Sequence, residues 1–136
     1  MLHVIAKNMV TQITDGVKIS VESTFQPGYS NADQNHYVFS YDIAIENNSE
    51  YTLQLLRRHW YIFDSNGETK EVEGEGVIGQ QPVLEPGQSH RYVSGCNLRT
   101  NMGKMFGTYL MERQIDGYRF EVLIPEFHLI VPYRLN

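Results

Sequence analysis

The sequence has a single cysteine and no long apolar run. With only Cys96, no intrachain disulfide can form, and a reducing compartment is the simplest setting. No apolar stretch approaches the roughly 20 residues of a membrane-spanning helix. Residues 1–6 lack the basic segment that opens a signal peptide. We therefore expect a cytoplasmic protein without membrane insertion.

Basic residues are also scarce. Lys and Arg number 11 against 16 Asp and Glu, which gives a formal net charge of −5. Such a chain repels phosphate backbones at long range, and its basic residues are dispersed rather than gathered into a groove. Arg57 and Arg58 are adjacent in an expected strand, so they point to opposite faces of it. Nucleic-acid binding is therefore not expected.

A helical period is missing as well, because apolar side chains recur at every second residue almost throughout. A chain of 136 residues fits one domain, which we assign to residues 1–136 with 1–8 as a loosely ordered N-terminal extension. The expected strands are 17–25, 37–45, 52–64, 68–72, 89–97, 104–115, 118–124 and 127–131. Seven or eight short strands separated by turns predict an all-β, antiparallel β-sandwich.

Three turn signals separate these strands. Asn66-Gly67 suits a type I′ hairpin, in which both residues have positive φ. Pro86-Gly87 fits the central positions of a type II turn, and Asp116-Gly117 indicates a second hairpin.

The segment 52–64 is apolar at both odd and even positions. A strand of that kind is expected at the centre of a sheet, with both faces at least partly covered. His59, inside this segment, is expected to pack beside Trp60 rather than to bind a ligand.

Residues 74–79 match GxGxxG through Gly74, Gly76 and Gly79. In dinucleotide-binding proteins this pattern follows a strand and opens a helix, whose N-terminus meets a pyrophosphate. Neither context is evident here, and neighbouring carboxylates would repel phosphate. A glycine-rich connection between sheets is the favoured interpretation, and phosphate binding stays open as the alternative.

Three glutamates precede or enter that segment. Glu71, Glu73 and Glu75 share one face of an extended strand, and carboxylate oxygens suit Mg²⁺ and tolerate Co²⁺. Along a straight strand the outer two lie about 13 Å apart, so sharing one ion requires the chain to bend. A solvated edge that discourages strand pairing is the simpler interpretation.

Signatures of catalysis are lacking. The five histidines are scattered without metal-ligand spacing, and no nucleophile motif is present. Cys96 resembles a small buried hydrophobic residue rather than an activated thiol. We expect neither an enzyme nor an obligatory cofactor, leaving open a weakly bound Mg²⁺ or Co²⁺.

From residue 37 onward, many positions together resemble the ApaG family, also called CorD. They are Tyr37-Val38-Phe39, Tyr41, Asn47, Trp60-Tyr61-Ile62-Phe63-Asp64, Gly67, Val72, the 74–79 segment, Gln81-Pro82, Leu84, Pro86-Gly87, Tyr92, Ser94-Gly95, Thr100, Gly103, Met105, Gly107, Tyr109, Ile124-Pro125 and Phe127. The resemblance spans about residues 17–131. The segment before Met9 lies outside it, which leaves Met9 open as an alternative start.

This resemblance implies an immunoglobulin-like, fibronectin type III-like sandwich, in agreement with the strand pattern. It also implies links to diadenosine tetraphosphate metabolism through gene neighbourhood, and to cobalt resistance and magnesium efflux through phenotype. Eukaryotic relatives carry the domain in interaction proteins. No family-wide catalytic residues are carried over.

Two hypotheses follow. The leading one is a non-catalytic interaction module for an unidentified protein partner, accessory to Co²⁺/Mg²⁺ homeostasis or efflux. The alternative is a small-ligand module that binds a divalent cation, a nucleotide phosphate or both at residues 71–79. A homo-oligomer through an edge strand is left open.

Overall fold

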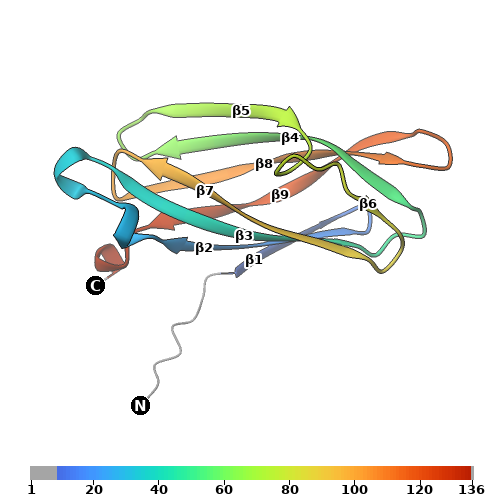
Figure 1. The fold of residues 1–136 in the computed structure, drawn as a ribbon, viewed down its shortest axis with the longest axis horizontal. Coiled ribbons are helices and arrows are strands. Elements are labelled where there is room, and N and C mark those ends of the chain that lie inside the picture. Colours follow the sequence, from blue (N-terminus) through green and yellow to red (C-terminus); the bar gives the residue numbers. More distant parts are fainter. Residues whose placement is uncertain (1–8, 136) are drawn as a thin grey trace, which may run out of the picture.

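The alternating sequence folds into two antiparallel β-sheets packed face to face, with their strands running along the long axis of the molecule (Figure 1). The structure is a computed structural model that describes residues 9–135, so the expected extension at 1–8 lies outside it. The strands are β1 (Met9–Thr14), β2 (Val17–Phe25), β3 (Tyr37–Asn47), β4 (Leu53–Asp64), β5 (Thr69–Glu75), β6 (Val83–Leu84), β7 (Ser89–Leu98), β8 (Met102–Arg113) and β9 (Arg119–Ile130). Short 3-10 turns cover Pro27–Tyr29 (η1), Ala32–Gln34 (η2) and Pro132–Leu135 (η3).

One sheet has the order β1-β2-β3-β7 and the other β5-β4-β8-β9, with β6 paired to β4. This confirms the expected antiparallel sandwich. None of the helices in residues 9–135 has the length and apolar character needed to cross a membrane.

The strand count differs from the expected seven or eight because of three local features. β1 has polar residues, Gln12 and Thr14, at two of its three half-buried positions, so its alternation is weak. β6 is only two residues long. The segments expected at 118–124 and 127–131 form one strand, β9, that runs through Pro125. An edge strand tolerates a proline, and the register with β8 shifts there, between Met105 and Gly107.

The inner faces of the two sheets form one hydrophobic core. At its centre the Tyr41 ring lies 5.4 Å from Trp60 and 5.7 Å from Phe127, and the last two rings meet edge to face at 5.8 Å. Aromatic pairs at these distances stabilise a core beyond the area that they bury.

The sandwich is closed along one long side and open along the other. On the closed side Ser23 Oγ donates to the carbonyl of His128 at 3.0 Å, and Thr14 Oγ1 accepts from the amide of Leu123 at 3.2 Å. On the opposite side β5 and β7 are edge strands, and no hydrogen bond joins them in the described chain. This leaves an opening between the sheets.

A β-bulge in β4 decides which side chains face the core. The register with β8 shifts between Leu55 and Arg57, so Leu56 is an extra residue. Before it, Leu53 and Leu55 are fully buried; after it, the inward positions are the even ones, Arg58, Trp60 and Ile62. The strand is therefore apolar at both odd and even positions because the inward-facing set changes from odd to even residues at the bulge. The expectation that both faces of β4 are covered is wrong in part, since in residues 9–135 no further layer lies on its outer face.

Two of the three turn predictions are confirmed. Glu85 accepts from Gln88 at 2.9 Å across a turn with Pro86 and Gly87 at its centre, and Gly87 has φ of 86°. Gly117 closes the β8–β9 hairpin with φ of 71°. The type I′ prediction at residues 66–67 is wrong, since only Gly67 has positive φ.

Asn47 is the one fully buried polar side chain among the described residues. Its Nδ2 donates to the carbonyls of Tyr51 and Leu84 at 2.8 and 2.9 Å, and its Oδ1 accepts from the amide and hydroxyl of Ser49 at 3.0 and 2.6 Å. One amide thereby ties the end of β3 to the next loop and to β6.

Replacing Asn47 with Ala should therefore lower the free energy of unfolding by about 2–4 kcal/mol, because buried carbonyls lose their donor. Chemical denaturation measures this loss. The matched control is Asn48→Ala at the exposed neighbour, where a change within about 0.5 kcal/mol is expected. Equal losses in the two variants would show that the buried amide has no special role.

Candidate functional site

The glycine-rich segment connects β5 to β6 across the bulge of β4. The amide of Gly76 donates to the carbonyl of Leu56, the bulge residue, at 2.8 Å. Val77 and Gln80 exchange two backbone hydrogen bonds of 2.8 and 3.0 Å. No α-helix follows the segment, or occurs elsewhere in residues 9–135, so the strand–turn–helix context of dinucleotide binding is absent there.

One of the three motif glycines, Gly76, is required by the chain's own packing, and Gly74 lies against the end of the Arg58 side chain. Gly76 has φ of 62°, and a Cβ there would lie 2.1 Å from the Gln80 carbonyl oxygen. A Cβ at Gly74 would lie 2.8 Å from Nη1 of Arg58. Gly79 also has positive φ, 71°, but open space around it. Phosphate binding by these glycines stays a prediction.

The three glutamates lie in a row along the outer face of β5, which stays extended through all of them. In the β4–β5 register they are opposite Tyr61, His59 and Arg57 respectively. No group of three or more His, Cys, Asp or Glu side chains in residues 9–135 is arranged to hold a metal ion.

His59 was not among the residues singled out with the glutamates, yet the structure places it between two of them. Its Nδ1 lies 3.0 Å from Glu73 Oε1, and its Nε2 lies 3.9 Å from Glu71 Oε2. The prediction that it packs beside Trp60 is wrong, because successive side chains of a strand point to opposite faces and Trp60 faces the core. Its ring stacks instead on Tyr61 at 4.5 Å.

An aromatic row continues from His59 across the outer face of the same sheet. Tyr61 stacks on Phe106 of β8 at 5.2 Å, and Phe106 stacks on Phe63 at 5.7 Å. All three ring pairs are within 19° of parallel. We call His59, Tyr61, Phe63 and Phe106 the outer aromatic row. These rings stack on one another, and no other strand or helix of residues 9–135 covers this face of the sheet.

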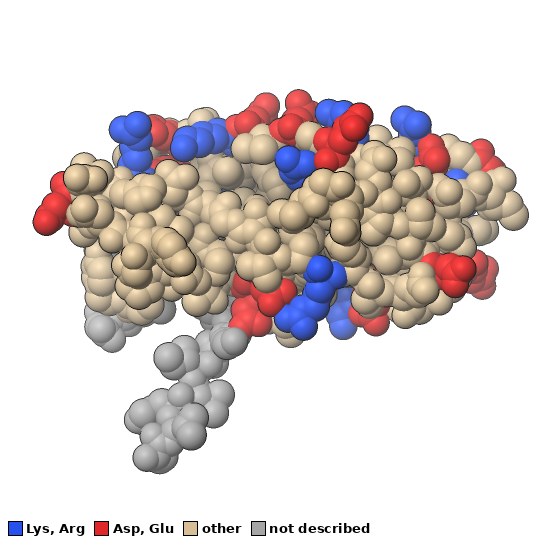
Figure 2. All heavy atoms as spheres, viewed as in Figure 1, with Lys and Arg blue, Asp and Glu red and all other residues tan. Residues whose placement is uncertain are grey.

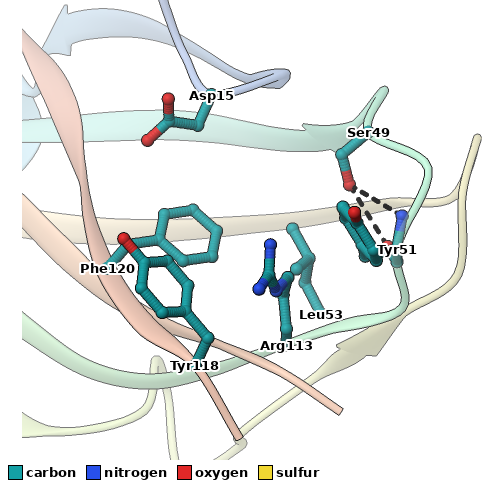
Figure 3. Close-up of a pocket in the computed structure, with 7 residues that line it drawn as sticks. All are labelled: Asp15, Ser49, Tyr51, Leu53, Arg113, Tyr118 and Phe120. Atoms are coloured by element: carbon teal, nitrogen blue, oxygen red, sulfur yellow. Dashed lines mark hydrogen bonds between the residues drawn. The ribbon is translucent and has the colours of Figure 1, made fainter. Parts of the chain in front are cut away.

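A cavity of about 320 Å³ lies at one end of the sandwich, where the β8–β9 hairpin meets the β1–β2 and β3–β4 turns (Figure 3). The Arg113 guanidinium lies 4.6 Å from the ring centroids of both Tyr51 and Tyr118. Its Nη2 is 2.6 Å from Asp116 Oδ2, and this hydrogen bond lowers the pKa of the carboxyl group. Because Arg113 already interacts with Asp116 and with the rings of Tyr51 and Tyr118, we infer that it stabilises the β8–β9 hairpin rather than binds a ligand.

Cys96 is half-buried against the core, as expected for a small hydrophobic residue. Burial raises the pKa of its thiol to about 11, so the thiolate is rare at neutral pH.

Comparisons with known proteins agree with the fold. A family model described as the ApaG domain matches residues 27–113. A protein named ApaG from Anaeromyxobacter dehalogenans is 47% identical over 128 residues, which is 94% of this chain and all of that protein. Protein ApaG from Brucella canis is 46% identical over 124 residues, covering 91% of this chain and 95% of that protein.

Two solved structures are similar as well. A crystal structure of a protein named ApaA from Bordetella pertussis has a TM-score of 0.83 at 42% sequence identity, covering 85% of this chain and 94% of that one. An X-ray structure of the structural genomics target SoR45 has a TM-score of 0.80 at 38% identity, covering 86% and 88%.

If the motif glycines serve the packing of the loop, their substitutions should differ in a defined order. Gly76→Ala adds a clash to a strained φ and should lower the free energy of unfolding by about 3 kcal/mol. Gly79→Ala, with open space around it, should lower it by about 1 kcal/mol. Chemical denaturation compares the two directly, and a larger loss at Gly79 would contradict this assignment.

Proposed function

Because the chain belongs to the ApaG family, we propose that it is a non-catalytic, cytoplasmic interaction module. In this proposal a protein partner docks on the outer face of the β5-β4-β8-β9 sheet. The observation that carries the proposal is the outer aromatic row, which presents stacked rings on a sheet face that no other element covers in the described chain. Aromatic residues are enriched at the centres of protein interfaces.

Apolar side chains extend this face beyond the rings. Leu123 of β9, outside the outer aromatic row, is 46% exposed, and Phe63 within the row is 36% exposed. The register places Leu123 beside Thr108 of β8, which is itself opposite His59. Exposed apolar side chains beside the rings add to the surface that a partner would bury.

The charges around the row favour a basic partner. The face is bordered by five glutamates: Glu71, Glu73 and Glu75 on β5, and Glu121 and Glu126 on β9. Its cations include Arg57, Lys104 and Arg119. Two of them are already paired, since Lys104 is 3.1 Å from Glu126 and Arg119 is 2.9 Å from Glu112. A partner segment that combines Lys or Arg with apolar side chains would match both the rings and the acidic border.

The family resemblance adds an accessory role in Co²⁺/Mg²⁺ homeostasis to this proposal. In that role the module would act through its partner, with the outer face as the point of contact.

Photocrosslinking in cells tests the docking face. A photoreactive phenylalanine analogue at Phe63 should yield a discrete protein adduct, whereas the same analogue at Val93, on the outer face of the other sheet, should not. Glu71→Lys with Glu73→Lys should reduce that adduct about tenfold, because the acidic border is reversed. Glu46→Lys with Glu50→Lys is the matched control. The same adduct from both positions would contradict the docking face.

The alternative, a divalent cation on β5, has one supporting observation. Nε2 of His59 is buried without a hydrogen-bond partner in residues 9–135 and faces Glu71. Imidazole and carboxylate together suit Co²⁺.

An amide-resolved NMR titration with Co²⁺ against excess Mg²⁺ tests this alternative. A site there predicts saturable broadening confined to residues near 59 and 71–75, lost in Glu71→Gln with Glu73→Gln. Unchanged broadening in that double variant would exclude the site.

A further inference from the structure

A second cleft lies on the open side of the sandwich, beneath the glycine-rich loop, and it differs from the proposed docking face. Its volume is about 230 Å³. It is lined by Tyr41, Arg58, Trp60, Tyr92 and Ser94, by Glu75 at the end of β5, and by loop residues 77–79. Figure 2 shows this side of the molecule, where charged side chains lie mainly along the upper and lower borders and the middle is made mainly of other residues.

Arg58 is the only cation among the residues that line the cleft. Its Nη1 donates to the carbonyls of Glu75 and Gly76 at 3.0 and 2.9 Å. Its Nε and Nη2 have no acceptor among the described residues, and no described carboxylate forms an ion pair with it. A half-buried guanidinium therefore keeps donors available beside an open space.

Hydroxyl groups add neutral donors. Tyr41, Tyr92 and Ser94 face the same cleft from β3 and β7. Burial raises the pKa of both tyrosines, so their hydroxyls stay protonated at neutral pH. The Tyr92 hydroxyl is hydrogen-bonded to that of Tyr109, and the Tyr41 hydroxyl to that of Ser94, so each pair keeps one proton. Together with Arg58 these protons can be donated to an oxyanion.

The loop supplies an apolar wall in a strained conformation. Ile78 has φ of 47°, which is rare for a β-branched residue, and its side chain is 62% exposed. Strain of this kind is often kept where a residue serves a ligand. Val77 and Trp60 line the cleft as buried apolar neighbours.

We propose that this cleft binds a small organic carboxylate with a branched apolar tail. The planar fork of Arg58 takes the carboxylate, with Tyr92 and the hydrogen-bonded Tyr41–Ser94 pair as further donors, and Ile78 and Trp60 contact the tail. Because Glu75 also lines the cleft, the single cation Arg58 matches at most a monoanion, and the absence of a second cation in the lining disfavours a dianionic phosphate.

Amide-resolved NMR titration with 4-methylpentanoate tests the proposal. Saturable shifts should be confined to residues 76–79, 92 and 94, with a dissociation constant in about the millimolar range expected for eight non-hydrogen atoms. The neutral 4-methylpentanamide should bind about tenfold more weakly or not at all, and inorganic phosphate more weakly than the carboxylate.

Variants of the two adjacent arginines provide the matched pair. Arg58→Met should weaken carboxylate binding about tenfold or more, whereas Arg57→Met, on the opposite face of β4, should leave it unchanged. If Arg58→Met does not fold, Arg58→Lys keeps the charge without the fork and should weaken binding by a smaller factor. Equal binding of acid and amide, tighter binding of phosphate, or full binding by a folded Arg58 variant would each overturn the proposal. These outcomes are independent of the docking face.

Discussion

The bulge at Leu56 is the constraint on which the rest of this structure depends. Without an extra residue there, Leu53 and Leu55 would place the odd positions of β4 toward the core along its whole length. With it, Trp60 enters the core and Tyr61 moves outward. A two-layer sandwich can cover only one face of such a strand, so the other apolar set remains at the surface.

The same bulge explains why the glycine-rich loop has its shape. The carbonyl of Leu56 accepts from the Gly76 amide and, at 3.0 Å, from Nε2 of Gln81. The amide of Leu55 donates to the Pro82 carbonyl at 3.0 Å. The loop thus satisfies backbone groups of β4 that lie between its pairing with β6 and its pairing with β5, and Arg58 binds the loop from inside. Hydrogen bonds therefore join the glycine-rich loop to the bulge of β4 and to Arg58, which lines the cleft.

Much of the fold could be predicted because alternation and turn chemistry are local properties. The alternating apolar residues of β2 and β3 and the Pro86-Gly87 turn are visible in the sequence alone. β1 was missed because Gln12 and Thr14 break its apolar pattern. The interruption expected at Pro125 was wrong because an edge strand does not need that amide.

The candidate site could be predicted only in part. The shared face of the three glutamates follows from the period of a strand, and the structure places them so. Their neighbour His59 depends on the β4–β5 register, and the inward direction of Arg58 depends on the bulge. Both are set by pairing between strands, and no local pattern contains that information.

The central claim is that the outer face of β4 and β8 is covered by a partner in the cell. Hydroxyl-radical footprinting, compared between intact cells and the purified protein, measures this for the unmodified chain. The account predicts that Tyr61, Phe63 and Leu123 are protected in cells, while exposed Ile13 and Val93 of the other sheet react equally in both settings. Equal reactivity of Tyr61 and Phe63 in cells and in isolation would contradict it.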